Sequence, residues 1–527
     1  MSSESVAERQ RGILGAIERV GNRLPDPVFL FGYLIIGLVA ISVISAWLGV
    51  SAAHPVLRDG SGAPTLVYAA SLLAPENVAR LWVDMPKTFT HFHPLGYVLL
   101  VMLGAGVAER SGFFAAGIRA AVRRAPKGLL TPVVATVAML SNHAADAGYV
   151  ILIPVAAIVY VSAGRHPLAG IACAFAGVSG GFSANITPGG LDALLFGITE
   201  AAVESSGLGG GWTVNIAGNW WFIAALMVIY IPIVWFVTDR IIEPRLGLWQ
   251  ADGEGAARDE EDDDALSDAQ VRGLKRAGLA ALAVVGLWLW MVFGPGTPLL
   301  IDGEEGKGLE WYQQAAPFFG SLVAAFMVLF LATGWAYGVA AGTIQSSQDL
   351  IDMLTESMKD MGYYLVLAFA AAHFVAMFNW SNLGLIMAVH GAEAIQSSGL
   401  PLAVLLGLIV LFSGLLNLFV GSASAKWALL APVLVPMLML LGISPEGATA
   451  AYRVGDSATN MITPLMVYFP LVLIFARRWQ ADFGLGSLTA MMIPYAVYMV
   501  IGGIALVMVW IGLGWDFGPG APMSIAL

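Results

Sequence analysis

The sequence has few charged residues for its length. Only 12% of its 527 residues are Asp, Glu, Lys or Arg, whereas 58% are hydrophobic and the mean hydropathy is +0.78. A water-soluble domain carries roughly a quarter charged residues. This shortage excludes a soluble globular protein, because the remaining residues could not cover a surface that faces water. We therefore expect lipid to surround most of the chain.

Cysteine and nucleotide-binding motifs are also scarce. The single cysteine, Cys173, lies in an apolar stretch, so no intrachain disulfide can form and we expect a small packing residue. The nearest approach to a phosphate-binding loop, DGEEGKG at 302–308, lacks both the spacing and the Ser/Thr of G-x-x-x-x-G-K-[ST]. An ATP-driven pump is therefore excluded, and active transport would have to draw on an ion gradient.

No apolar signal segment precedes the first long apolar run. Residues 1–27 are polar and amphipathic, so we expect a cytoplasmic N-terminal segment and no cleaved signal peptide. Much of the net charge of −11 falls inside residues 241–275, which we interpret as an acidic cytoplasmic linker. We expect no nucleic-acid partner. His91 and His93 are two residues apart and do not converge on a metal.

Nine apolar runs are long enough to cross a bilayer. The basic residues Arg9, Arg11, Arg19 and Arg23 precede the first run, so the positive-inside rule places the N-terminus in the cytoplasm and the C-terminus outside. The expected spans are 28–50, 89–108, 167–200, 212–238, 277–293, 315–341, 362–390, 451–476 and 487–513, with 51–87 and 110–127 as connecting loops.

Two further apolar segments are too long for one span. Residues 129–164 have basic residues at both ends, and residues 399–443 have none at either end. We interpret both as re-entrant hairpins, the first entering from the cytoplasm and the second from outside. Their polar tips lie at 141–148 and 419–427. The sequence thus predicts an all-α polytopic membrane protein with nine transmembrane helices and two re-entrant hairpins.

The two halves of the chain repeat one pattern. The tip SNHAADAGYVILIP (141–154) resembles SASAKWALLAPVLVP (422–436), and each is followed by Ser-Ala, Asn and Ile-Thr-Pro, at 180–190 and 454–466. This order predicts an inverted repeat with discontinuous helices, as in secondary transporters whose sites lie where half-helices end. A proline kink packed against its neighbours is the alternative. The expected division is 1–27, 28–240 with the first hairpin, 241–275, and 276–527 with the second hairpin.

Charged residues inside spans are candidates for function because they are costly in lipid. Arg453 and Asp456 share one helix face and could simply neutralise each other. Alternatively, the planar guanidinium of Arg453 suits a substrate carboxylate. Asp456, with Asn417, Ser457 and Asn460, would then offer oxygen ligands to Na⁺.

Other candidates lie near the predicted breaks and tips. Asp192 follows the first Ile-Thr-Pro and could carry a proton, or it could reach the outer interface. Trp427 could stack on an aromatic substrate or lie at the lipid interface. Lys426 and Asp146 could pair within the site, and Glu393 is expected at the interface. Additional oxygen donors are Ser141, Asn142, Ser183, Asn185, Thr187, Ser422, Ser457 and Asn460.

The chain resembles the p-aminobenzoyl-glutamate transporter (AbgT) family of bacterial inner-membrane proteins. The most specific part is KWALLAPVLVPMLMLLGISPEGATAAYRVGDSATNMITP, which contains Trp427, Pro445 and Arg453, together with Asp192 in NITPGGLDALL. The resemblance implies that these four residues line the transport path. It also implies that Asn417 and Asp456 belong to a Na⁺ site, and that the protein is a homodimer with a bowl-like aqueous cavity.

The resemblance further implies transport of p-aminobenzoyl-glutamate, or export of p-aminobenzoic-acid-like antimetabolites such as sulfonamides. A Na⁺-coupled dicarboxylate transporter is an alternative, because aliphatic dicarboxylates would satisfy every group except the ring. A channel or ion exchanger without an organic substrate is another. An intramembrane serine hydrolase is a third, since GVSGG (177–181) formally fits G-x-S-x-G and Ser179 could pair with His373 or His390. That motif requires a strand-turn-helix context which a membrane helix does not provide, so we expect no enzyme.

Overall fold

The computed structural model describes most of the chain. The described residues are 26–58, 60–123, 126–144, 148–209, 212, 214–247, 249, 266–296, 298–301, 303–309, 311–463, 466 and 468–525. Residues 1–25 of the predicted N-terminal segment and residues 250–265 of the acidic linker lie outside this set, as does Asp146. The expected domain boundaries there stay predictions.

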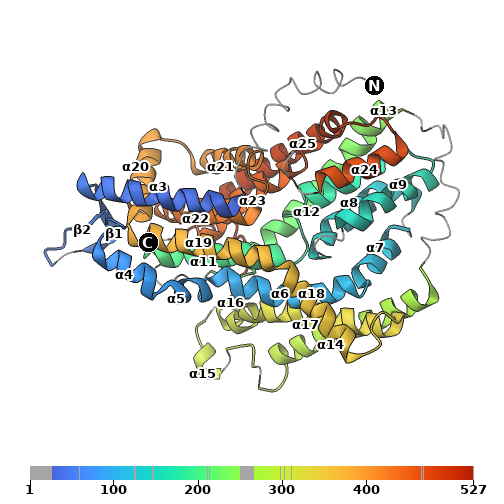
Figure 1. Cartoon of the computed structure of the whole chain (residues 1–527), viewed down its shortest axis with the longest axis horizontal. Coiled ribbons are helices and arrows are strands. Elements are labelled where there is room, and N and C mark those ends of the chain that lie inside the picture. The colour runs from blue at the N-terminus through green and yellow to red at the C-terminus, as the bar shows by residue number, and fades with distance from the viewer. Residues whose placement is uncertain are drawn as a thin grey trace.

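The described chain is predominantly helical, and most of its long helices run along the long axis of the molecule (Figure 1). Seven described helices are long and apolar enough to cross a membrane, or eight if the bent pair α6 and α7 is one span. Three shorter apolar helices, Gly148–Ser162, Pro167–Gly180 and Leu402–Asn417, fall where the hairpins and one broken span were predicted. The count of nine spans stays a prediction.

The segment 51–87, which was predicted as a loop, contains regular secondary structure. After α3 (Pro27–Trp47), the strands β1 (Ser51–Arg58) and β2 (Pro64–Tyr68) form an antiparallel hairpin, followed by α4 (Pro75–Val83) and α5 (Met85–Thr90). An all-α description is therefore wrong for this segment. The hairpin lies at the left end of Figure 1, near the labelled C-terminal end.

The second predicted loop is also partly helical. Helix α6 (His93–Arg110) ends at a turn where Gly112 has φ +87°, and α7 (Phe113–Arg123) leaves at an angle of 64°. Arginines had marked this stretch as a loop, but its apolar residues gather on one side of an amphipathic helix. The loop prediction for 110–127 is therefore wrong over most of its length.

The first overlong segment contains two half-helices, and residues 145–147 between them lie outside the described residues. A 3₁₀ turn leads into α8, a second 3₁₀ turn and a π-turn flank the tip, and α9 ends the segment. Their bounds are Lys127–Leu129, Leu130–Leu140, Ser141–Ala144, Gly148–Leu152 and Ile153–Ser162. The interruption between α8 and α9 therefore overlaps the predicted tip at 141–148, whereas the re-entrant hairpin and its entry from the cytoplasm stay predictions.

The next predicted span is broken near its centre. Helix α10 (Pro167–Phe175) continues as a π-turn (Ala176–Gly180), unwinds, and resumes as α11 (Gly190–Ser206). Helix α12 (Trp220–Val237), a π-turn (Thr238–Ile242) and α13 (Glu243–Leu246) complete the first half.

The second half begins with a pair of long helices. Helices α14 (Asp268–Phe293) and α17 (Ala316–Ala341) pack together, and α17 packs along α6 in the lower part of Figure 1. Between them lie α15 (Gly303–Gly306) and α16 (Trp311–Gln314), and α18 (Ser347–Asp360) follows.

The span expected at 362–390 is two helices. Helix α19 (Gly362–Trp380) ends at a turn in which Asn382 has φ +59°, and α20 (Leu383–Ser398) starts from it. Asparagine accepts this left-handed backbone more readily than other residues with a side chain. The expectation of one continuous helix is wrong.

The remaining helices repeat the order of the first half. Helices α21 (Leu402–Asn417) and α22 (Ala423–Leu440) flank the second tip, α23 (Pro445–Asn460) ends at a break, and α24 (Phe469–Trp479) resumes. Helix α25 (Leu485–Leu513) packs against α21 and α23. Half-helix, tip, half-helix, helix, break and helix thus occur in both halves. The opposite orientation of the two halves stays a prediction.

Candidate functional site

Helix α23 is polar yet enclosed by protein. Its first fourteen residues, Pro445–Ala458, are all buried, although they include charged and hydroxyl side chains. Ser444 caps its start by accepting a hydrogen bond from the N–H of Gly447, and Pro445 occupies the first turn. A helix of this composition cannot face lipid, so neighbouring helices must provide partners for its polar groups.

Gly455 allows α23 to lie directly against α21. A Cβ atom at this position would be 2.0 Å from the carbonyl oxygen of Val410 and 2.9 Å from the amide nitrogen of Gly414. Ser413 adds a hydrogen bond of 2.8 Å from its hydroxyl to the carbonyl oxygen of Tyr452. The two backbones are therefore in contact midway along the site.

Asp192 and Arg453 form a buried ion pair across the two halves. Arg453 Nη1 is 2.8 Å from Asp192 Oδ1, and the side chains are only 2% and 7% exposed. The second carboxylate oxygen accepts a hydrogen bond of 2.8 Å from the N–H of Gly189 at the start of α11. This helix start favours an anion. The structure thus brings together two residues that the sequence singled out separately.

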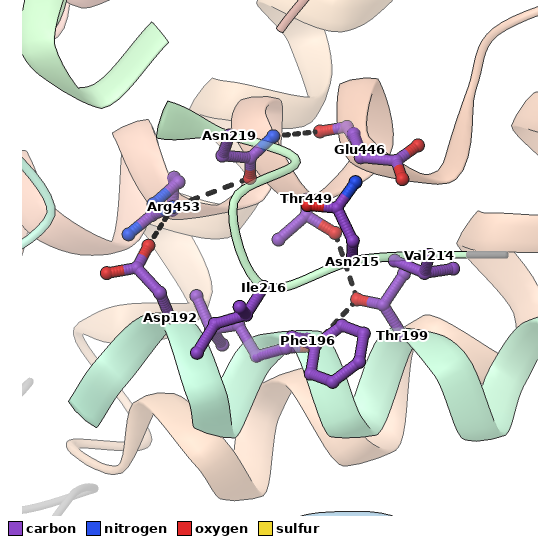
Figure 2. A pocket seen from close by; sticks show the side chains of 11 residues that line it. Asp192, Phe196, Thr199, Val214, Asn215, Ile216, Asn219, Glu446, Thr449 and Arg453 are labelled. Carbon is purple, nitrogen blue, oxygen red and sulfur yellow. Dashed lines mark hydrogen bonds and ion pairs between the residues drawn. The ribbon is translucent and has the colours of Figure 1, made fainter. Parts of the chain in front are cut away.

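Asn219 extends this pair toward the start of α23. Its side-chain oxygen accepts a hydrogen bond of 3.4 Å from Arg453 Nη1, and its amide nitrogen donates to the carbonyl oxygen of Glu446 at 2.9 Å. Figure 2 shows Arg453 facing Asp192 on one side and Asn219 on the other. The Nε–H of Arg453 has no hydrogen-bond partner among the described residues. The Nε–H of this guanidinium could therefore donate a hydrogen bond to a bound ligand.

A cavity opens beside the pair. It has a volume of about 20 Å³ and is lined by Asp192, Leu195, Phe196, Thr199, Val214, Asn215, Ile216, Asn219, Glu446, Thr449 and Arg453 (Figure 2). A larger cavity of about 720 Å³ shares four of these residues and reaches Tyr97, Phe319 and Pro519. A molecule in the larger space would therefore lie next to the ion pair.

Sequence reasoning missed Glu446 and Asn219. Glu446 is 2% exposed, lines the cavity, and neither of its carboxyl oxygens has a hydrogen-bond partner among the described residues. Glu446 fell outside the predicted spans, one of which began at 451, whereas Asn219 lay within the span 212–238 and was not singled out. A carboxyl group within SPEG, between two apolar stretches, was the available signal for Glu446.

Trp427 lies behind the cavity. Its ring is fully buried and stacks on Tyr452, with 4.5 Å between ring centroids and 23° between planes. Its Nε1–H donates to Thr199 Oγ1 at 2.9 Å, and Thr199 is 2.9 Å from the hydroxyl of Thr449. Thr449 in turn donates to the carbonyl oxygen of Pro445 at 3.0 Å. Trp427 and Pro445 thus contact residues that line the cavity, and neither lines it directly.

The pairing of Arg453 with Asp456, left open by the sequence, does not occur. Asp456 is instead paired with Lys426, whose ammonium also donates to Asn417 Oδ1. The amide nitrogen of Asn417 donates to the carbonyl oxygen of Asp456 at 2.7 Å and to Thr459 at 3.1 Å. The two residues expected to bind Na⁺ are therefore together, but a lysine contacts both. They do not fit a Na⁺ ion while Lys426 remains between them.

The other predicted oxygen donors lie around the tips and breaks. Ser457 donates to the carbonyl oxygen of Gly180 at 2.6 Å and accepts from the N–H of Ser183 at 3.1 Å, which joins the two breaks. The remaining groups bond locally or across the first tip: Ser141 and Asn142 to α8 carbonyls, Asn185 to Met139, Thr187 to His143, and Ser422 as the cap of α22. Asn460 is the last residue of α23.

A profile of the AbgT putative transporter family matches residues 12–525. The chain belongs to this family. Over 522 residues it is 35% identical to the p-aminobenzoyl-glutamate transport protein of Escherichia coli strain K12, covering 99% of this chain and 98% of that protein.

Two solved AbgT structures resemble this AbgT chain over nearly its full length. The Alcanivorax borkumensis YdaH transporter, described as having an unusual topology, has a TM-score of 0.86 and 42% identity, covering 94% of this chain and 100% of that one. Neisseria gonorrhoeae MtrF, described with a class of antimetabolite efflux pumps, has a TM-score of 0.86 and 40% identity, covering 95% and 97%. The resemblance inferred from the sequence is thus confirmed, and this AbgT protein is a membrane transporter.

The hydrolase alternative has no support in this AbgT structure. Ser179 is fully buried, and its hydroxyl donates to Met466 Sδ at 3.3 Å. His373 contacts the carbonyl oxygen of Phe369, and His390 contacts Glu393. The AbgT relatives are transporters, so the expectation that this chain is no enzyme is confirmed. Glu393 is 65% exposed.

Proposed function

We propose that this AbgT transporter is an ion-gradient-driven secondary transporter of p-aminobenzoyl-glutamate or of p-aminobenzoic-acid-like antimetabolites across the bacterial inner membrane. Supporting this proposal, one relative is named for p-aminobenzoyl-glutamate transport and another is described with antimetabolite efflux pumps. The absence of a nucleotide-binding motif in the sequence supports an ion gradient as the energy source.

One observation carries the proposal, namely the buried Arg453–Asp192 pair beside a cavity. Arg453 presents a planar fork of donors, and its Nε–H has no partner among the described residues. A substrate carboxylate entering from the larger cavity would accept from Arg453 and compete with Asp192 for it. The aromatic ring would then lie near Phe196, which lines both cavities.

A Na⁺-coupled dicarboxylate transporter remains the second candidate, because Arg453 would bind either class of anion. Phe196 and Tyr97 favour the aromatic substrate, since their rings are 5.1 Å apart at the cavity wall and offer a surface for another ring.

The proposed architecture is nine spans with two re-entrant hairpins in an inverted repeat, with the N-terminus in the cytoplasm and the C-terminus in the periplasm. The matching order of half-helices, tips and breaks in the two halves supports it. We also propose a homodimer, as the resemblance implied.

Counterflow in proteoliposomes tests this function. Proteoliposomes containing the purified protein would be loaded with radiolabelled p-aminobenzoyl-glutamate, and its flux measured under an imposed Na⁺ or proton gradient. A sulfonamide and an aliphatic dicarboxylate would serve as competitors. We expect competition by the sulfonamide and stimulation by at least one gradient. Competition by the dicarboxylate alone would favour the second candidate, and flux independent of both gradients would refute ion coupling.

A further inference from the structure

Glu446 is an acidic residue in the first turn of α23 that is enclosed by protein. It is 2% exposed, and neither of its carboxyl oxygens has a hydrogen-bond partner among the described residues. Arg453 lines the same cavity but pairs with Asp192, and Figure 2 shows the carboxyl group of Glu446 turned away from it. Within the described structure, no cation therefore neutralises this carboxyl group.

The segment that leads into α12 closes over the carboxyl group. A Cβ atom at Gly218 would lie 2.7 Å from Glu446 Cγ and 3.3 Å from its Oε1, so a larger residue would clash there. The amide nitrogen of Asn219 then donates to the carbonyl oxygen of Glu446 at 2.9 Å. Residues 214–216 of the same segment line both the cavity of about 20 Å³ and the larger one. This segment is therefore a wall that the two cavities share.

Glu446 carries a proton in this arrangement. An ionised carboxyl group that is buried without donors or a counter-charge loses its hydration, and the neutral form is favoured instead. The other charged or titratable residues that line the two cavities are Asp192, Arg453, Glu200 and Tyr97, and the first two neutralise each other. Ionised Glu446 would thus add an uncompensated negative charge beside the ion pair.

The charge of Glu446 affects the position where a substrate carboxylate would bind. Asn219 contacts both sides, since its side-chain oxygen accepts from Arg453 Nη1 at 3.4 Å while its amide nitrogen donates to Glu446. Like charges repel strongly in a protein interior. An anionic substrate at Arg453 therefore binds more tightly when Glu446 is neutral, and by reciprocity the bound substrate holds the proton on Glu446.

We propose that Glu446 is the proton-binding residue of the transport cycle, and that its proton and the substrate carboxylate at Arg453 bind cooperatively and cross together. The proposal rests on the ion-driven function proposed above and names the proton as the ion. The proton passes between the carboxyl group of Glu446 and water in the larger cavity when residues 214–216 move aside. Once Glu446 is ionised, the substrate is released and Arg453 returns to Asp192.

The direct test compares exchange with proton-driven accumulation in proteoliposomes that contain Glu446→Gln. Glutamine keeps the shape of the neutral acid but has no proton to release. Exchange of labelled for unlabelled p-aminobenzoyl-glutamate requires no release of the proton, whereas net accumulation does. We expect counterflow to fall by no more than about threefold, and accumulation driven by a pH gradient to fall by at least about tenfold.

Glu393→Gln is the matched control, because Glu393 is 65% exposed on α20. It should accumulate substrate as the wild type does. The proposal is overturned if Glu446→Gln still accumulates substrate in response to the pH gradient. Wild-type counterflow that ignores a pH gradient, or substrate driven against the proton, would also overturn it and would leave the substrate assignment intact.

A second measurement needs no substrate. Infrared difference spectra of the full-length protein in lipid nanodiscs, recorded between acidic and alkaline buffer, would detect the C=O stretch of a carboxylic acid that ionises. We expect a band in the wild type and in Glu393→Gln that is missing from Glu446→Gln. The same band in Glu446→Gln, or no band in the wild type, contradicts the assignment. Absence of counterflow in the wild type would count against the proposed function alone.

A third measurement uses only the wild type, in case Glu446→Gln does not fold. Substrate would be added to the purified protein in weak buffer with a pH indicator. We expect the solution to become more alkaline, because cooperative binding takes up a proton, and the affinity for substrate to fall by at least about tenfold from acidic to alkaline buffer. Proton release on binding, or an affinity that does not change with pH, would refute the cooperativity.

Discussion

Two acidic–basic pairs lie on successive turns of α23, and they differ in their surroundings. Arg453 pairs with Asp192 from the other half of the chain, beside a cavity, and keeps one donor unused. Asp456 pairs with Lys426 from the same half, and Asn417 completes its environment. In the proposed function the first pair accepts another anion, whereas the second holds the ammonium of Lys426. The three-residue spacing of Arg453 and Asp456 thus places them in two different ion pairs.

The largest effect should come from breaking the first pair. Arg453→Ala and Asp192→Ala each leave a buried charge without its partner, a loss that costs roughly 3–5 kcal/mol. We expect both variants to fold with a lower melting temperature and to lose p-aminobenzoyl-glutamate counterflow by about 100-fold or more. Thermal unfolding and proteoliposome flux would measure the two effects.

The control for this comparison is Arg110→Ala. Arg110 pairs with Asp360 where both side chains are partly exposed, at 34% and 62%, and such a pair contributes about 0–1 kcal/mol. Its flux should stay within about twofold of wild type. Wild-type flux in both Arg453→Ala and Asp192→Ala would refute the assignment of the substrate site.

An intermediate effect is expected where the two pairs are linked. Thr199→Val keeps the shape of the side chain but leaves the Trp427 indole N–H without its acceptor, a loss of about 1–3 kcal/mol. We expect roughly tenfold weaker substrate binding, with flux reduced and not abolished. Equilibrium binding of labelled substrate would check this.

Thr489→Val is a suitable control for the threonine change. Thr489 is buried in α25, and among the described residues its hydroxyl bonds only to the carbonyl oxygen of Leu485 in the same helix, so its loss should leave substrate binding unaltered. Equal effects of the two substitutions would mean that Thr199 acts only through stability.

The smallest effect is expected at Ser179. Its hydroxyl contacts only the sulfur of Met466 in the described structure, and alanine fills nearly the same space. The transport rate of Ser179→Ala should stay within about twofold of the wild-type rate, because substitutions that remove no special interaction have small effects on stability. Complete loss of transport, together with loss of acylation by a serine-reactive probe, would revive the hydrolase alternative.

Much of the fold was predictable from patterns within the chain. The tips at 141–148 and 419–427 and the breaks after 180 and 460 were marked by polar residues and glycine inside apolar runs. The β-hairpin at 51–68 was missed although Asp59-Gly60 is a turn motif, because the whole segment was treated as a loop between spans. Helix α7 was missed because its arginines suggested a loop. Composition thus reveals breaks within apolar membrane segments better than it reveals secondary structure in the polar segments that connect them.

Several individual residues of the site could be predicted from the sequence, but the contacts among them could not. Asp192, Arg453, Asn417 and Asp456 were identified because charges and amides are unusual in spans. Which charge neutralises which depends on how α11 and α22 pack on α23, and spacing along one helix only left a pair between Arg453 and Asp456 open. Glu446 was missed because it lies in a short polar segment before the predicted span.

The glycine at position 455 has a mechanical consequence. With backbone touching backbone at Val410 and Gly414, α21 cannot slide or rotate past α23 without a steric clash, so these two helices should travel as one rigid body. Helix α22, which enters the second tip from its other side, has no such glycine contact with α23 among the described residues. The second tip therefore joins one helix whose backbone touches α23 to another that packs on α11, α19 and α20, and the second of these carries Lys426.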